Sequence, residues 1–120
     1  PFDTGRLRGV IEAACKGANW GRKLPKGHGL GLAFSYSFLS YTATVVELKV
    51  DDKGAVTLLS ADMAMDCGPQ ITPERVRNQM EGAVIMGMSL AMMSEISFEK
   101  GAVSPTSTIL WWRATTRRHP

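Results

Sequence analysis

The sequence predicts an α+β fold, in which helices and an antiparallel sheet come from separate segments of the chain. Residues 4–18 and 72–96 carry apolar side chains in helical patterns, whereas residues 30–66 are rich in β-branched and aromatic residues. The order is therefore an N-terminal helix, a long antiparallel β-hairpin or meander, a second helix and a short terminal strand, which is typical of the α+β class.

The N-terminal helix is predicted from apolar residues three and four positions apart, at Leu7, Val10, Ile11 and Ala14. Thr4 is a suitable N-cap, and Gly17 suits the exit from the helix. A connection rich in glycine, lysine and proline follows and contains His28. No carboxylate or cysteine lies near this histidine in sequence, so we expect it to face solvent.

The strand region begins at Leu30 and continues to Val50, where Glu47 and Lys49 alternate with valine and leucine. This alternation predicts a strand that exposes Glu47 and Lys49 on one wet face. The sequence DDKG at 51–54 predicts a turn with Gly54 in the left-handed conformation.

The returning strand covers residues 55–66, and its apolar residues shift from even-numbered to odd-numbered positions within the strand. Val56 and Leu58 occupy even positions, whereas the later apolar residues occupy the odd positions 59, 61 and 63. Because side chains alternate between the two faces of a strand, one extra residue is needed to keep the apolar set on one face. We therefore expect a β-bulge near residues 58–60.

The second helix is predicted from Thr72 as N-cap, Pro73 at the first helical position and Glu74 beside the positive helix end. We expect it to run to about Ile96. From Gly82 onward nearly every face is apolar, which indicates a buried helix. A sheet of this size can cover only one side of the helix, and the N-terminal helix is too short to cover the rest, so the sequence resembles the interior of a larger protein.

Composition excludes several classes of function. A net charge of +3 without a basic stripe argues against a nucleic-acid partner, and the apolar part of the second helix is too short for a membrane span. Cys15 and Cys67 have no neighbouring ligand at metal-site spacing, so we expect neither a metal site nor a disulfide framework. No Ser-His-Asp arrangement or nucleophile elbow is present, and we expect no catalytic residue in this chain.

One face of the second helix carries Gln79, Gly82, Ala83 and Met86, at positions i, i+3, i+4 and i+7. An internal glycine costs about 1 kcal/mol relative to alanine, so Gly82 and Gly87 indicate a close approach by a ligand or by another backbone. With Arg75 and Arg77 nearby, this face could receive an anionic, hydrogen-bonding ligand. Tight helix packing, with Gln79 bonded to a loop carbonyl, is the other interpretation, and both remain open.

Residues 50–101 resemble the molybdopterin-binding large subunit of the xanthine dehydrogenase and aldehyde oxidase family, closest to its isoquinoline 1-oxidoreductase beta branch. The shared frame is D-x-G after a strand, a turn with proline, Q-x-E-G-G/A and a spaced glycine in an apolar helix ending in glutamate. Here it comprises Asp66, Gly68, Pro73, Gln79, Glu81, Gly82, Ala83, Gly87 and Glu95. Residues 1–14 and 27–48 are similar to the preceding helix and strand of that branch. Ala83 departs from the second glycine that is more common there.

The resemblance implies that Gln79, Gly82 and Ala83 bind a molybdenum–molybdopterin cofactor, in a dinucleotide form, and that the family reaction hydroxylates an aldehyde or an N-heterocycle. It also implies that iron–sulfur clusters lie on a 2Fe–2S partner subunit. The general base of the family belongs to a downstream G-V/L/I-G-E motif, which this sequence lacks. Residues 1–103 would therefore be part of a molybdopterin-binding domain, completed by the rest of the large subunit and inactive alone.

Residues 104–120 lack acidic side chains and depart from the family pattern, so we expect an irregular tail. We hypothesise a frameshift, because one reading frame beginning at the third base of the Pro105 codon permits Asn-Phe-Asn-Asp. A basic terminus without fixed structure is the alternative. For the chain as a whole, the alternative is a non-catalytic α+β interaction or oligomerisation module. Substrate and cellular compartment are not determined by these residues.

Overall fold

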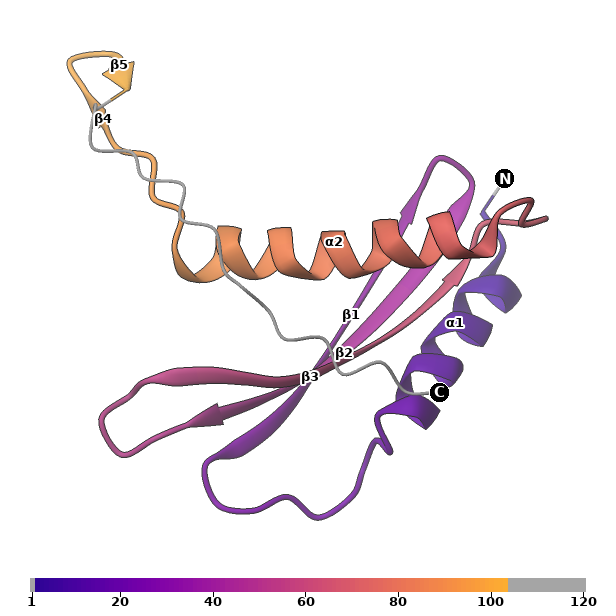
Figure 1. The fold of residues 1–120 in the computed structure, drawn as a ribbon, viewed down its shortest axis with the longest axis horizontal. Coiled ribbons are helices and arrows are strands. Elements are labelled where there is room, and N and C mark those ends of the chain that lie inside the picture. The colour runs from indigo at the N-terminus through magenta and orange to yellow at the C-terminus, as the bar shows by residue number, and fades with distance from the viewer. Residues whose placement is uncertain (1, 104–120) are drawn as a thin grey trace. The chain divides into compact units, whose positions relative to one another are not determined.

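The computed structural model describes residues 2–103 and confirms the predicted α+β class (Figure 1). Two helices accompany a three-stranded antiparallel sheet and a small two-stranded sheet. The chain forms two compact units, one ending at Ile71 and one beginning at Thr72. The predicted tail, residues 104–120, lies outside the described residues.

Helix α1 spans Thr4–Gly17. Its N-cap is Asp3 and not Thr4, because the Asp3 carboxylate accepts hydrogen bonds from the backbone N–H groups of Gly5 and Arg6 at 2.8 and 3.1 Å. A carboxylate at this position satisfies backbone donors that have no partner within the helix. The helix ends at the glycine that the sequence indicated.

The large sheet has the order β1-β2-β3, with β1 at His28–Ser37, β2 at Ser40–Val50 and β3 at Val56–Asp66. The region expected as one strand from Leu30 to Val50 is therefore two strands. They are joined by a tight turn in which Phe38 and Leu39 both have positive φ, of 47° and 62°. Such turns normally contain asparagine or glycine, so Phe-Leu carries no turn signal in the sequence.

The core of the first unit lies between α1 and the sheet. The fully buried residues Tyr41, Ala43 and Val45 of β2 pack with three residues of α1 and its C-cap, which are Val10, Ala14 and Ala18. Because side chains two apart share a face, Glu47 lies on the same face as Val45. The predicted wet face is wrong for Glu47, whose side chain is only 13% exposed, whereas Lys49 is exposed as expected.

Two local predictions for the second and third strands are confirmed. Glu47 pairs with Ser60 and Leu48 with Leu58, so Leu59 is the extra residue of a β-bulge within the predicted range. The 51–54 turn has Gly54 at a φ of 82°, and the Asp51 carboxylate closes it by accepting two backbone hydrogen bonds. The turn depends on neighbouring residues, and the bulge is visible in the parity of the apolar residues along β3, which explains why the sequence indicates both.

In the second unit, helix α2 spans Pro73–Met92 and ends four residues before the predicted Ile96. Thr72 is the N-cap, as predicted, although its side chain makes no capping hydrogen bond. The hydroxyl of Ser94 donates to the carbonyl of Ser89 where the helix stops. Where one short terminal strand was expected, two short strands, β4 (Phe98–Glu99) and β5 (Ala102–Val103), pair as a hairpin.

The apolar sequence of α2 predicts a buried helix, but the described residues do not provide that burial. Ser89 is the one buried residue of α2, whereas Met86 and Leu90 are 65% and 61% exposed. Within the described residues, no helix is long and apolar enough to cross a membrane. The apolar surface of α2 therefore requires another explanation.

Candidate functional site

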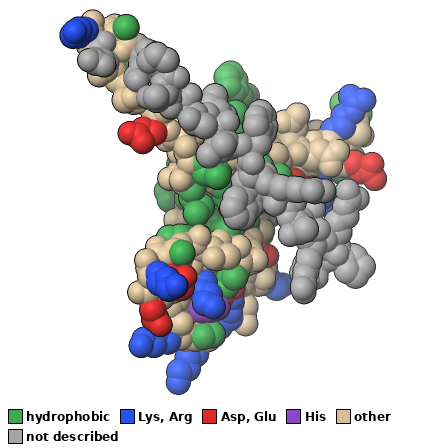
Figure 2. Space-filling model, turned by 60° about the vertical axis from the view of Figure 1, so that its left-hand side comes forward, with side chains coloured by type: hydrophobic (Ala, Val, Ile, Leu, Met, Phe, Trp, Pro, Cys, Tyr) green, Lys and Arg blue, Asp and Glu red, His purple; other side chains and the backbone are tan. Residues whose placement is uncertain are grey.

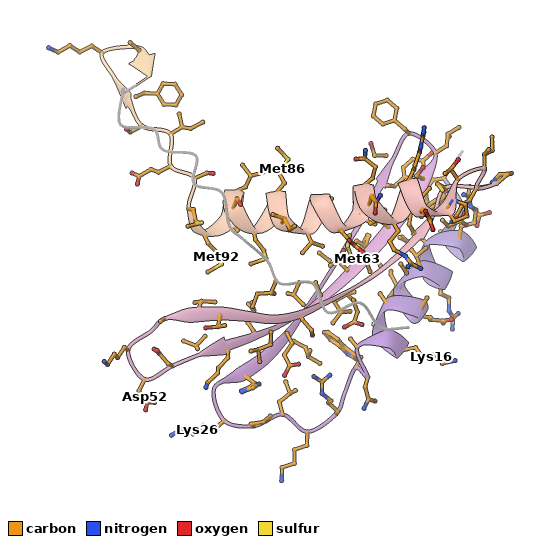
Figure 3. The ribbon with its side chains drawn as sticks, in the orientation of Figure 1. Lys16, Lys26, Asp52, Met63, Met86 and Met92 are labelled. Atoms are coloured by element: carbon orange, nitrogen blue, oxygen red, sulfur yellow. The ribbon has the colours of Figure 1, made fainter. Side chains whose placement is uncertain are left out.

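The predicted cofactor face lies on the first half of α2. Gln79, Gly82 and Ala83 are exposed and follow one another at helical spacing, and Met86 continues the row one turn further. Figure 3 shows Met86 and Met92 projecting from opposite sides of α2, and helical spacing puts Gln79 and Ala83 on the side of Met86. The helix thus brings together all three residues predicted to bind a cofactor.

Among the described residues, nothing covers this face, and its central side chains are small. A Cβ atom added to Gly82 or Gly87 would meet no described atom within 4 Å. The side-chain amide of Gln79 makes no hydrogen bond to another residue within 2–103. Within residues 2–103, no loop carbonyl accepts a hydrogen bond from this amide, and no described atom fills the space beside Gly82.

The N-terminal end of α2 favours an anionic group. Arg75 and Arg77 are exposed, and the helix dipole places partial positive charge at the same end. An amide that can both donate and accept hydrogen bonds, next to residues without bulky side chains, fits a flat polar cofactor such as a pterin. In residues 2–103, no group of three His, Cys, Asp or Glu could hold a metal ion directly.

The D-x-G motif at the end of β3 has a structural role that the sequence did not reveal. The Arg6 guanidinium binds the Asp66 carboxylate through two hydrogen bonds of 2.8 and 2.7 Å, and the backbone N–H of Gly68 donates to the same carboxylate at 3.1 Å. These bonds lower the pKa of Asp66 to about 2, mainly through Arg6, and the carboxylate raises the pKa of Arg6. Gly68 has a φ of 77°, which favours glycine at the third position of the motif.

Tyr41 connects this ion pair to the start of the chain. The Arg6 guanidinium lies 4.7 Å from the centre of the Tyr41 ring, and the Tyr41 hydroxyl accepts a hydrogen bond from the Asp3 N–H at 2.6 Å. Tyr41 is almost completely buried. The contacts therefore fix the first turn of α1 to the end of β3 and stabilise the point where the chain leaves the sheet.

A second polar cluster joins the connection after α1 to the sheet. Glu47 receives a hydrogen bond from Arg22 at 2.5 Å, and its other oxygen lies 3.0 Å from Nδ1 of His28. The bond with His28 lowers the pKa of Glu47, and the positive charge of Arg22 lowers it further. The prediction of a solvent-facing loop histidine is wrong, since His28 begins β1 and its side chain is 18% exposed.

The sequence could not reveal this cluster because Glu47 reaches its partners through strand pairing. His28 and Glu47 are 19 residues apart, and the antiparallel register of β1 and β2 brings them together. Figure 2 shows charged side chains of both signs gathered around this histidine. Arg22 and His28 give the Glu47 carboxylate, on the core face of the sheet, the polar partners that water would otherwise provide. The role of the cluster is therefore structural.

Comparison with known proteins matches residues 11–110 to a protein family described as molybdopterin cofactor-binding domain. Similar proteins include the isoquinoline 1-oxidoreductase subunit beta of Brevundimonas diminuta, 28% identical over 98 residues, with 78% of this chain and 12% of that protein covered. The abscisic-aldehyde oxidase of Arabidopsis thaliana is 36% identical over 76 residues, covering 62% of this chain and 6% of that protein.

A third similar protein is named as a membrane-bound, pyrroloquinoline-quinone aldehyde dehydrogenase, from Gluconacetobacter polyoxogenes. It is 26% identical over 102 residues, which cover 80% of this chain and 13% of that protein. No solved structure matches this chain significantly. The chain therefore spans about an eighth or less of the length of these relatives.

Proposed function

Since this chain belongs to the molybdopterin cofactor-binding domain family, we propose that it forms part of the cofactor-binding wall of a molybdenum-dependent oxidoreductase. The observation that carries the proposal is the family match over residues 11–110, which includes the open face of α2. The printed name of one relative contains a different cofactor, a quinone. The family description favours molybdopterin, because it applies to the matched segment itself.

Within this wall, Gln79 would hold the cofactor by hydrogen bonds between its side-chain amide and a polar edge of the pterin. Gly82 and Ala83 would let a flat ring approach the helix, because neither has a side chain beyond Cβ. Arg75 and Arg77 would attract the anionic part of the cofactor. When bound, the cofactor supplies the oxidation chemistry of the enzyme, and these residues bind and orient it.

The reaction would require the rest of a larger subunit. This chain spans 12% of the isoquinoline 1-oxidoreductase beta subunit, and it lacks the G-V/L/I-G-E motif implied by the family resemblance. We propose that the complete protein hydroxylates an aldehyde or an N-heterocycle, binds a dinucleotide form of the cofactor and passes electrons to a 2Fe–2S partner subunit. The 120 residues alone would be inactive.

A non-catalytic interaction or oligomerisation module is the second candidate. It is favoured by exposed apolar residues in the second unit, where Leu90, Ile96 and Phe98 are 61%, 65% and 71% exposed. A segment that the rest of a large subunit covers would show the same exposed apolar residues when that rest is absent. Family membership supports the cofactor-binding proposal over the module.

The test measures the binding of isolated molybdopterin to the full 120-residue chain. The fluorescence of the pterin, recorded under anaerobic conditions, reports the bound fraction. We expect Gln79→Ala to weaken binding about 2- to 10-fold, the range expected for losing one hydrogen bond. Asn78→Ala is the matched control, because Asn78 is an exposed amide one position away on α2 and faces another direction.

Equal affinity of Gln79→Ala and Asn78→Ala would contradict the assignment of Gln79. A Gly82→Val variant provides a second measurement, because its branched side chain would fill the space beside the amide without removing a polar group. Loss of binding in Gly82→Val, together with normal binding in Asn78→Ala, would locate the cofactor on this face.

A further inference from the structure

The outer edge of β1 has none of the usual protection of an exposed strand. Within residues 2–103, β1 pairs with β2 along one edge and with no strand along the other. Its ten residues, HGLGLAFSYS, contain no lysine, arginine, aspartate, glutamate or proline. Natural edge strands commonly carry such residues or a bulge, because unpaired backbone groups otherwise recruit another strand.

The opposite edge of the same sheet is protected. Strand β3 has a bulge at Leu59, and it carries two acidic residues, Asp62 and Asp66. Bulges and charges both hinder the addition of a further strand. The two edges of one sheet therefore differ, and only the β1 edge is suited to accept a partner strand.

The β1 edge also carries an exposed apolar row, formed by Leu32, Phe34 and Tyr36. These side chains are 37%, 60% and 38% exposed. They pair with Val45, Ala43 and Tyr41 of β2, which are each 1% exposed, so the row lies on the core face of the sheet. Helix α1 packs mainly on β2 and β3, and the ring of Phe2, just before α1, contacts Tyr36 with ring centres 5.3 Å apart, so the row is only partly covered.

The β1–β2 turn extends this surface. Phe38 and Leu39 are 99% and 64% exposed, and both adopt positive φ, which disfavours side chains of this size. A turn that needs only to reverse the chain would be more stable with asparagine and glycine. Bulky apolar residues at these two positions are explained if another segment contacts them.

We propose that an extended strand from the part of the large subunit outside these 120 residues pairs with the free edge of β1 and buries the Leu32–Phe34–Tyr36 row. This inference rests on the proposed function only in taking the chain as a segment of a larger subunit. The chain covers 12% of the isoquinoline 1-oxidoreductase beta subunit, so ample chain exists to supply the strand.

A second copy of this chain fits the surface less well. Two β1 strands that pair antiparallel would place each Phe38–Leu39 turn beyond the opposite end of its partner strand. The turn side chains would then remain exposed, and their conformation would remain unexplained. A longer segment can pair with β1 and also contact the turn, so it accounts for both features.

The experiment combines the full 120-residue chain with overlapping peptides of about 15 residues, a length sufficient to pair along all of β1. The peptides cover the complete sequence of the Brevundimonas diminuta isoquinoline 1-oxidoreductase subunit beta. Binding is measured by fluorescence anisotropy, and the contacted element is identified by amide hydrogen exchange. We expect a peptide with alternating apolar residues, from outside the matched region, to slow exchange in β1.

The variant Phe34→Lys should weaken binding of that peptide about tenfold or more, because it puts a charge in the centre of the apolar row. Leu59→Lys is the matched control, since it makes the same kind of exchange on the other edge strand, at a residue that is 45% exposed. It should bind the peptide like the parent chain. Circular dichroism of both variants checks that the fold is retained.

The proposal is overturned if no peptide protects β1, or if Phe34→Lys and Leu59→Lys bind equally well. Protection of β1 that rises with chain concentration in the absence of peptide would identify a second copy as the partner and would also overturn it. Gln79→Ala should bind the peptide normally. Strand addition and pterin binding can therefore fail independently of each other.

Discussion

Asp66 and Glu47 show how much of this fold depends on pairs that are distant in the sequence. Asp66 is held by Arg6, 60 residues away, and Glu47 by Arg22, 25 residues away. The sequence places each residue on a helix, strand or connection, but it does not show which charges meet. Gln79, Gly82 and Ala83 could be assigned to one face because helical spacing alone determines that relation.

The pH dependence of stability should reveal the Asp66–Arg6 pair. The pKa of Asp66 falls from 3.8 to about 2 on folding, so its contribution to stability is complete above about pH 5 and is lost as the pH falls toward 2. We expect Asp66→Asn to be less stable than the parent at pH 7, and the difference to narrow between about pH 5 and 2. Melting temperatures across this range measure it.

The control for this series is Asp52→Asn, which changes an exposed carboxylate in the 51–54 turn. Its stability should follow that of the parent at every pH. A constant difference between Asp66→Asn and the parent from pH 7 to pH 2 would show that the carboxylate charge is not responsible. The lowered pKa of Glu47 acts in the same direction, so the variant keeps part of the acid sensitivity.

At the scale of elements, predictions succeeded where local chemistry decides the conformation. Gly54 indicated its turn, the parity change after Leu58 indicated the bulge, and Pro73 indicated the start of α2. The Phe38–Leu39 turn was missed because the conformation runs against the preferences of both residues. Tertiary context decides there, and the apolar pattern of α2 likewise predicted a burial that residues 2–103 do not provide.

The Phe38–Leu39 turn should be more stable with residues that favour positive φ. We expect Phe38→Asn combined with Leu39→Gly to raise the free energy of unfolding by about 1–2 kcal/mol, since it relieves two left-handed residues. Both side chains are exposed, so little packing is lost. Urea denaturation measures the change.

Gly54→Ala provides the opposite test in the second turn of the sheet. Gly54 has a φ of 82°, and nothing among the described residues lies within 4 Å of an added Cβ, so any effect comes from the backbone. It should lower the free energy of unfolding by about 1 kcal/mol, as measured by urea denaturation.

For the β1–β2 turn, a double variant at positions 38 and 39 that is no more stable than the parent would mean that this turn is not strained.

At the scale of the whole molecule, the chain has a small core and much exposed apolar surface. Its buried hydrophobic residues number six among those described, and all belong to the first unit. A segment that covers 12% of a relative is expected to leave surfaces that other segments bury. The free edge of β1 and the apolar residues of α2 have this character.

The genomic sequence on both sides of this reading frame tests the proposal at that scale. We expect it to encode further molybdopterin-binding segments, including the G-V/L/I-G-E motif, and a neighbouring gene for a 2Fe–2S protein. The proposed frameshift makes a sharper prediction. A single-base shift at the Pro105 codon should open Asn-Phe-x-Asp, close to residue 110, where the family match ends. Flanking DNA that encodes no further molybdopterin-binding segments would favour the independent interaction module. The frameshift would be excluded if no single-base shift at the Pro105 codon opens Asn-Phe-x-Asp.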